Sequence, residues 1–147
     1  MIKRIIAVPR MQIDHWVDNK ITPFGVWALI SISDEETGRG LAPLRFLGCR
    51  KLLAERFHDI TMESRVVLDE LTDSKGRPIE LFNETKAKRI VQFIDDINSR
   101  DIETLVVNCA AGVSRSGAVS LFACRYLKLD EKMFREENKY IHPNSSY

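Results

Sequence analysis

The chain has 147 residues, of which 44% are hydrophobic and 29% are charged, and its formal net charge is +1. These values are typical of one globular domain, and they exclude a disordered chain and a basic protein with an extended nucleic-acid surface. The apolar start of the chain is interrupted at Pro9 and Arg10, so we expect neither a signal sequence nor a membrane span.

Strand and helix patterns alternate through the first part of the chain. The apolar run at 5–8 predicts a first strand, and residues 11–18 have a helical pattern. Residues 25–32 predict a second, central strand, which the polar loop 33–40 ends. Residues 51–57 predict a third strand.

The alternation continues through the middle of the chain. Residues 64–71 predict a further strand or hairpin arm, and a turn follows at 73–78. Apolar residues recur at helical spacing between 84 and 99, which predicts an amphipathic helix. Residues 104–107 are apolar and β-branched, and they predict a short buried strand.

Two helices are predicted in the last part of the chain. Residues 116–124 are apolar nearly all round, which predicts a core helix that runs to about residue 128. Asp130 is a typical N-cap for a last helix through residue 140, before Pro143. The whole pattern predicts an α/β fold, in which helices flank a parallel or mixed central sheet, within a single domain that spans residues 1–147.

Residues 108–116, with the sequence Asn-Cys-Ala-Ala-Gly-Val-Ser-Arg-Ser, join the predicted strand 104–107 to the core helix. They place Cys109 and Arg115 six positions apart across a loop of small side chains. The backbone N–H groups of such a loop, at the start of a helix, can form an anion-binding site. The residues predicted to bind phosphate are Ala110, Ala111, Gly112, Val113, Ser114 and Arg115.

Cys109 and Arg115 are residue types that phosphoryl transfer can use. Peptide N–H dipoles, a helix N-terminus and a guanidinium all favour the thiolate form of a cysteine, which is the nucleophile. The planar fork of an arginine can bind two oxygens of a phosphoryl group. Ser116 can hydrogen-bond the sulfur of Cys109 and help it leave when a phosphocysteine intermediate breaks down.

Residues 109–116 resemble the signature of the cysteine-dependent protein tyrosine phosphatases, His-Cys-x5-Arg-Ser/Thr, and look most like the dual-specificity branch. The resemblance implies a phosphatase-like fold over most of the chain, a reaction that needs no metal or cofactor, and a phosphorylated protein or peptide as partner. Asn108 stands where the family has histidine, and asparagine donates hydrogen bonds but cannot carry positive charge. Cys109 is therefore expected to be less activated than the family's cysteine.

The leaving oxygen needs a proton, so a general acid is expected near Cys109. In the resembled family this acid is an aspartate upstream of the cysteine, on a loop that follows a strand. Asp59 follows the predicted strand 51–57 and is the first choice, with Asp69 and Asp73 as alternatives. His58 is expected to be exposed.

The substrate is predicted from the loop's own side chains. Ala110, Ala111 and Val113 bring no cation, whereas inositide phosphatases of this superfamily tend to have lysines there. Phosphotyrosine in proteins is therefore the first expectation, with phosphoserine and phosphothreonine next, and neither a membrane nor a nucleic acid is an expected partner. Two alternatives stay open: an RNA 5′-phosphatase on the same scaffold, and a phosphate-binding pseudophosphatase.

The three cysteines lack the spacing of a metal site and suit a reducing compartment, which predicts a cytoplasmic protein. Cys124 is expected in the core, and a disulfide between Cys49 and oxidised Cys109 is a further hypothesis. Five cations could face an anionic substrate or form a solvated surface: Arg39, Arg45, Arg50, Lys51 and Arg56.

Overall fold

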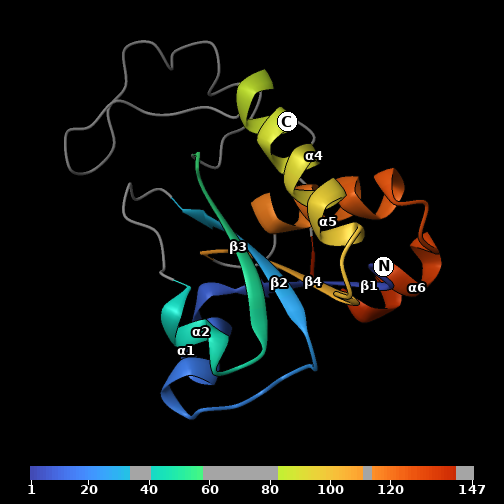
Figure 1. The fold of residues 1–147 in the computed structure, drawn as a ribbon. Helices are drawn as coiled ribbons and strands as arrows, with labels where there is room; N and C mark the ends of the chain where they lie inside the picture. Colours follow the sequence, from blue (N-terminus) through green and yellow to red (C-terminus); the bar gives the residue numbers. More distant parts are fainter. Residues whose placement is uncertain (34–40, 58–82, 111–113, 142–147) are drawn as a thin grey trace.

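A parallel sheet of four strands lies at the centre of the computed structural model, which describes residues 1–33, 41–57, 83–110 and 114–141 (Figure 1). The strand order is β1-β4-β2-β3, and every neighbouring pair is parallel. The strands are β1 (Arg4–Pro9), β2 (Trp27–Ser33), β3 (Cys49–Arg56) and β4 (Thr104–Cys109). The predicted fold class is confirmed.

The two inner strands are buried because each has a strand on both sides and helices on both faces. Every residue of β4 is buried, as is every residue of β2 except Ser33. Their uninterrupted apolar and β-branched sequences are typical of strands in this position, since neither face meets water. The predictions of these two strands from their sequence patterns are therefore confirmed.

Helices cover the two faces of the sheet in two groups (Figure 1). On one face, α1 (Arg10–Asp18) and α2 (Ala42–Arg45) pack over an aromatic cluster in which the rings of Trp16 and Trp27 have centroids 5.8 Å apart. The other face is covered by α4 (Glu84–Asn98), α5 (Arg115–Tyr126) and α6 (Glu131–Glu137).

Most differences from the sequence predictions lie at the ends of elements. The last helix ends at Glu137 rather than at residue 140, although Asp130 caps it as predicted by accepting hydrogen bonds from two backbone N–H groups. The helix α5 is not buried all round, because Phe122 and Tyr126 are exposed. The short helix α2 was not predicted, and the predicted strand 64–71 and turn 73–78 lie outside the described residues.

Asn138 binds α6 to the outer edge of the sheet. Its Oδ1 accepts a hydrogen bond from the backbone N–H of Ala7 at 2.8 Å, and its Nδ2 donates to the carbonyl of Ile5 at 2.9 Å. The same Nδ2 donates to the carbonyl of Phe134 within α6. Asn138 is buried, so this single side chain satisfies polar groups of β1 that would otherwise lack partners.

None of the described helices combines the length and the hydropathy that a membrane-spanning segment requires.

Candidate active site

Cys109 is the last residue of β4, at the carboxyl end of the sheet. The sequence pattern placed it in the loop after a strand that ends at Val107, and this boundary was wrong. The strand continues for two residues because Asn108 and Cys109 pair with Val8 and Pro9 of β1. Cys109 is 2% exposed and belongs to the hydrophobic cluster on the α4–α5 face. Its sulfur is thus held by a strand rather than by a loop alone.

The helices that follow β4 and its two neighbouring strands lie on opposite faces of the sheet, an arrangement that favours a ligand site. The helix that follows β4 lies on one face of the sheet, whereas α1 and α2, which follow β1 and β2, lie on the other face. In open α/β sheets such a switch point leaves a crevice at the carboxyl ends of the strands, where ligands bind. Cys109 stands at this switch point.

Ser116 and Cys109 are brought together by the turn from β4 into α5. The Sγ atom of Cys109 lies 3.3 Å from the Oγ atom of Ser116, and Ser116 is fully buried. In the thiol form the S–H group donates to the hydroxyl, and in the thiolate form the hydroxyl donates to the sulfur. The helix α5 begins at Arg115, so the N–H groups of its first turn, which lack helical partners, lie next to this pair.

Arg115 is the first residue of α5 and is 5% exposed. Its Nη1 donates a hydrogen bond of 3.0 Å to the backbone carbonyl of Phe57, which is the last described residue after β3. The guanidinium is therefore fixed between the segment after β3 and the start of α5. Asp59, the predicted general acid, follows Phe57 by two positions in the sequence.

Several predicted site residues fall outside the described residues. They are Ala111, Gly112 and Val113 of the loop, His58, and the three candidate acids Asp59, Asp69 and Asp73. The two ends of the loop are described. Ala110 is exposed, and its carbonyl accepts a hydrogen bond of 3.3 Å from the N–H of Arg10 at the start of α1. Ser114 is the N-cap residue of α5.

Asn108 points to the face of the sheet opposite Cys109, because successive side chains of a strand alternate. It is 1% exposed and lies between Val8 of β1 and Ser31 of β2. Its Oδ1 has no hydrogen-bond partner within the described residues. Any effect of Asn108 on the thiol therefore acts through the backbone of β4 or through the electric field of its side chain, and not through side-chain contact.

A charge network around the buried Glu55, which the sequence did not predict, joins β3 to α4. Glu55 is buried and accepts hydrogen bonds of 2.6 and 3.0 Å from Arg89, and the Nζ atom of Lys86 lies 4.0 Å from the same carboxylate. Glu55 precedes Phe57 by two residues. This network therefore fixes the end of β3 directly before Phe57, whose carbonyl accepts the hydrogen bond from Arg115. No local pattern reveals such a pairing.

Cys49 cannot form the hypothesised disulfide with Cys109. Both Cys49 and Thr104 pair with Trp27, so Cys49 lies level with the first residue of β4. Cys109 is five residues further along the strand direction, about 16 Å away. A disulfide needs Cα atoms within about 7 Å.

Cys124 is buried in the core, as predicted, and its Sγ donates to the carbonyl of Leu129.

The five predicted cations do not gather at this end of the sheet. Arg45, Arg50 and Lys51 lie at its amino end, Arg56 ends β3, and Arg39 lies outside the described residues. Within the part of the chain that the structure describes, no three His, Cys, Asp or Glu side chains gather as a metal site would require.

Neither a protein-family model nor a curated protein sequence matches the chain. Solved structures do match. The crystal structure of Tk-PTP in the active form has a TM-score of 0.53 and 14% identity over 95% of this chain and 82% of that chain. The chain shares the fold of Tk-PTP. A mutant form of the same protein matches with a TM-score of 0.49 and 15% identity, over 91% of this chain and 75% of that chain.

Proposed function

We propose that this chain is a cysteine-dependent phosphatase that hydrolyses phosphomonoesters, with phosphotyrosine in proteins as the first substrate class. The observation that carries the proposal is the placement of Cys109 beside Ser116 at the first turn of α5, next to the buried Arg115. The likeness in fold to Tk-PTP, a protein tyrosine phosphatase, supports it. The Cys-x5-Arg-Ser spacing supports the same chemistry.

The first step transfers the phosphoryl group to the protein. The thiolate of Cys109 attacks phosphorus, the S–P bond forms, and the P–O bond to the leaving group breaks with its electron pair going to oxygen. Asp59 gives its proton to that oxygen. Arg115 binds two oxygens of the transferring group, and loop N–H groups bind the developing charge.

The second step returns the enzyme to its starting state. Asp59, now a carboxylate, takes a proton from water, whose oxygen attacks phosphorus as the S–P bond breaks. The sulfur leaves as a thiolate, which accepts a hydrogen bond from the hydroxyl of Ser116. Inorganic phosphate is the product, and no electron donor or metal enters the balance.

Release of inorganic phosphate from a panel of substrates tests the proposal. The panel holds phosphotyrosine, phosphoserine and phosphothreonine peptides, an inositide and an RNA with a 5′-phosphate. We expect release from the phosphotyrosine peptide, unchanged activity with an added chelator, and a trapped adduct on Cys109 after acid quenching. Turnover of the RNA alone would move the proposal to an RNA 5′-phosphatase.

The second candidate is a phosphate-binding pseudophosphatase, which the buried, uncharged Asn108 favours. It binds a phosphotyrosine peptide through the same loop but releases no phosphate. Binding without turnover of any substrate in the panel would establish this alternative and overturn the proposed enzyme.

A further inference from the structure

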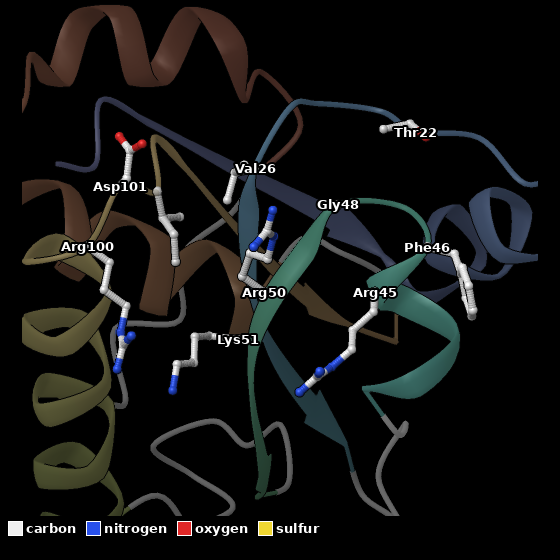
Figure 2. Close-up of a pocket in the computed structure, with 10 residues that line it drawn as sticks. Thr22, Val26, Arg45, Phe46, Gly48, Arg50, Lys51, Arg100 and Asp101 are labelled. Carbon is white, nitrogen blue, oxygen red and sulfur yellow. The ribbon is translucent and has the colours of Figure 1, made fainter.

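A basic cavity of about 770 Å³ lies at the amino end of the sheet (Figure 2). Four cationic side chains line it: Arg45 of α2, Arg50 and Lys51 of β3, and Arg100, which follows α4. In Figure 2 the side chains of Arg50 and Lys51 project from β3, that of Arg45 lies on one side of the strand, and that of Arg100 lies on the other side, beside α4. These residues are up to 55 positions apart in the sequence, so the fold rather than a local charge run brings them together.

Positive charge is in excess in this cavity. Asp96 is shared by Arg100, through two contacts of 3.1 Å, and by Lys51 at 4.0 Å, and Asp101 is the one carboxylate among the lining residues. Neither Arg45 nor Arg50 has an ion-pair partner within the described residues. Among the described residues, four cations thus face two carboxylates, and the two cations without an ion-pair partner there are both arginines.

The backbone at the start of β3 has an irregular conformation at Arg50. Trp27 pairs with Cys49, and Ala28 pairs with Lys51, so Arg50 is an extra residue in β3 and forms a bulge. Bulges are rare between parallel strands and redirect a side chain. Gly48 precedes the bulge with a φ of 94°, and a Cβ atom there would overlap the carbonyl oxygen of Gly25. Two adjacent backbone irregularities therefore form one wall of the cavity.

The cavity is separate from the candidate active site. Its strand residues lie level with Thr104, whereas Cys109 lies about 16 Å further along β4. A phosphoryl group bound at Cys109 cannot reach Arg45 or Arg50 at the opposite end of the sheet. A ligand in the cavity therefore does not touch the groups proposed to react.

We propose that this cavity is a second anion-binding site, which takes a small ligand with two or more phosphoryl groups. Its volume lies within the range of small-molecule sites and exceeds what one phosphate fills. Guanidinium forks bind phosphoryl oxygens in pairs, and two such forks from different elements suit two phosphoryl groups. The excess of two positive charges matches a multiply charged ligand.

Titration with inorganic tripolyphosphate, followed by NMR of the arginine Nε–Hε groups, tests this proposal. These resonances report the cavity directly, so binding of the same probe at Arg115 is seen as a separate event. We expect the resonances of Arg45 and Arg50 to shift together. We expect tripolyphosphate to bind more tightly than orthophosphate, and more tightly than citrate or a hexa-aspartate peptide.

A double variant with a matched control completes the test. Arg45→Gln with Arg50→Gln should weaken tripolyphosphate binding at the cavity by about tenfold or more, as expected for the loss of charge-assisted contacts. Lys132→Gln with Lys139→Gln removes the same charge from exposed positions in and just after α6 and should change it less than about twofold. Equal effects of the two double variants, or unshifted Arg45 and Arg50 resonances, would overturn the proposal, as would tighter binding of the acidic peptide. Hydrolytic activity does not enter these readouts.

Discussion

The two ends of the parallel sheet each hold a buried cysteine, in opposite surroundings. At the amino end, the Sγ atom of Cys49 donates to the carbonyl of Lys51, and burial raises the pKa of this thiol to about 12. At the carboxyl end, Cys109 is nearly as buried, but its sulfur meets the hydroxyl of Ser116 and the first turn of α5. At Cys49 burial outweighs the backbone contact with Lys51, which lowers the pKa, whereas the hydroxyl of Ser116 and the N–H groups at the start of α5 can donate to a thiolate at Cys109. We therefore expect the two thiols to differ in reactivity, because the groups nearest to each sulfur differ.

The arginines at the two ends differ in a related way. Arg115 is buried and bound to the carbonyl of Phe57, whereas Arg45 and Arg50 are exposed and have no ion-pair partner within the described residues. A fixed guanidinium suits a reaction that needs one geometry, because little ordering remains to be done when the substrate arrives. Exposed arginines such as Arg45 and Arg50 are suited to bind an anion without taking part in a reaction.

Exchange of sulfur for oxygen tests the comparison of the two cysteines most directly. Cys109→Ser should lower phosphatase turnover on the order of 10⁴-fold or more, since a hydroxyl in the same place is a far weaker nucleophile. Cys49→Ser makes the same exchange at the other end of the sheet and should leave kcat unchanged. Steady-state kinetics with a phosphotyrosine peptide measures both. Substantial turnover by folded Cys109→Ser would contradict the covalent mechanism.

Removal of the fixed guanidinium should have the next largest effect. Arg115→Ala should lower kcat/KM by about 10³–10⁵-fold, the range over which an arginine contributes to phosphoryl transfer. Arg115→Lys keeps the charge but loses the fork, so it should recover only a small part of the activity. Thermal denaturation of both variants is the control for folding. Wild-type activity in Arg115→Lys would show that charge, rather than the fork, is what the site uses.

The proposed general acid can be identified by comparing three variants. Asp59→Asn should slow hydrolysis of an aryl phosphate by ~10²–10⁴-fold, the usual contribution of a general acid, and flatten the basic limb of the pH profile. The effect should shrink for substrates whose leaving group needs no proton. Asp69→Asn and Asp73→Asn are the matched controls. If either control shows this pattern in place of Asp59→Asn, the assignment of the acid is wrong.

Alkylation with iodoacetate gives the smallest expected effects and reads both cysteines at once. Because burial raises the pKa of Cys49 to about 12, roughly one molecule in a thousand carries its thiolate at pH 9, and labelling there should be slow. Cys109 should be labelled first, at lower pH. Asn108→His should raise the labelling rate of Cys109 a few-fold at mildly acidic pH, since an imidazole can carry positive charge and so favour the thiolate. Peptide mass spectrometry over a pH series measures each site.

An unchanged profile in folded Asn108→His has a definite meaning. It would show that Asn108 already supports the loop as well as histidine does. The pseudophosphatase candidate would then lose the observation that favours it.

The sequence predicted those parts of the fold that short-range patterns encode. The buried strands β2 and β4 and the amphipathic α4 follow from apolar spacing, and the cap of α6 follows from Asp130. The end of β4 was not predictable, because its last two residues are strand through pairing with β1 and, for Asn108, also with β2, both of which lie more than seventy positions earlier. The four-residue α2 is too short to show a helical period.

The candidate site likewise has parts that the sequence predicts and parts that it does not. The cysteine, arginine and serine are recognisable because their spacing carries the chemistry. The hydrogen bond from Arg115 to the carbonyl of Phe57 is not, since every residue has a carbonyl and 58 positions separate the two. The network of Glu55 with Arg89 likewise joins residues 34 positions apart without a local pattern. The sequence thus predicts the candidate reacting groups, and tertiary contacts determine what holds them.

The side chain of Asn138 has a consequence for self-assembly. An uncovered outer strand offers unpaired N–H and carbonyl groups to which a strand of another molecule can add. On β1 the amide of Asn138 already binds the N–H of Ala7 and the carbonyl of Ile5, in the positions that an added strand would use. These two hydrogen bonds therefore disfavour association by continuation of the sheet across β1.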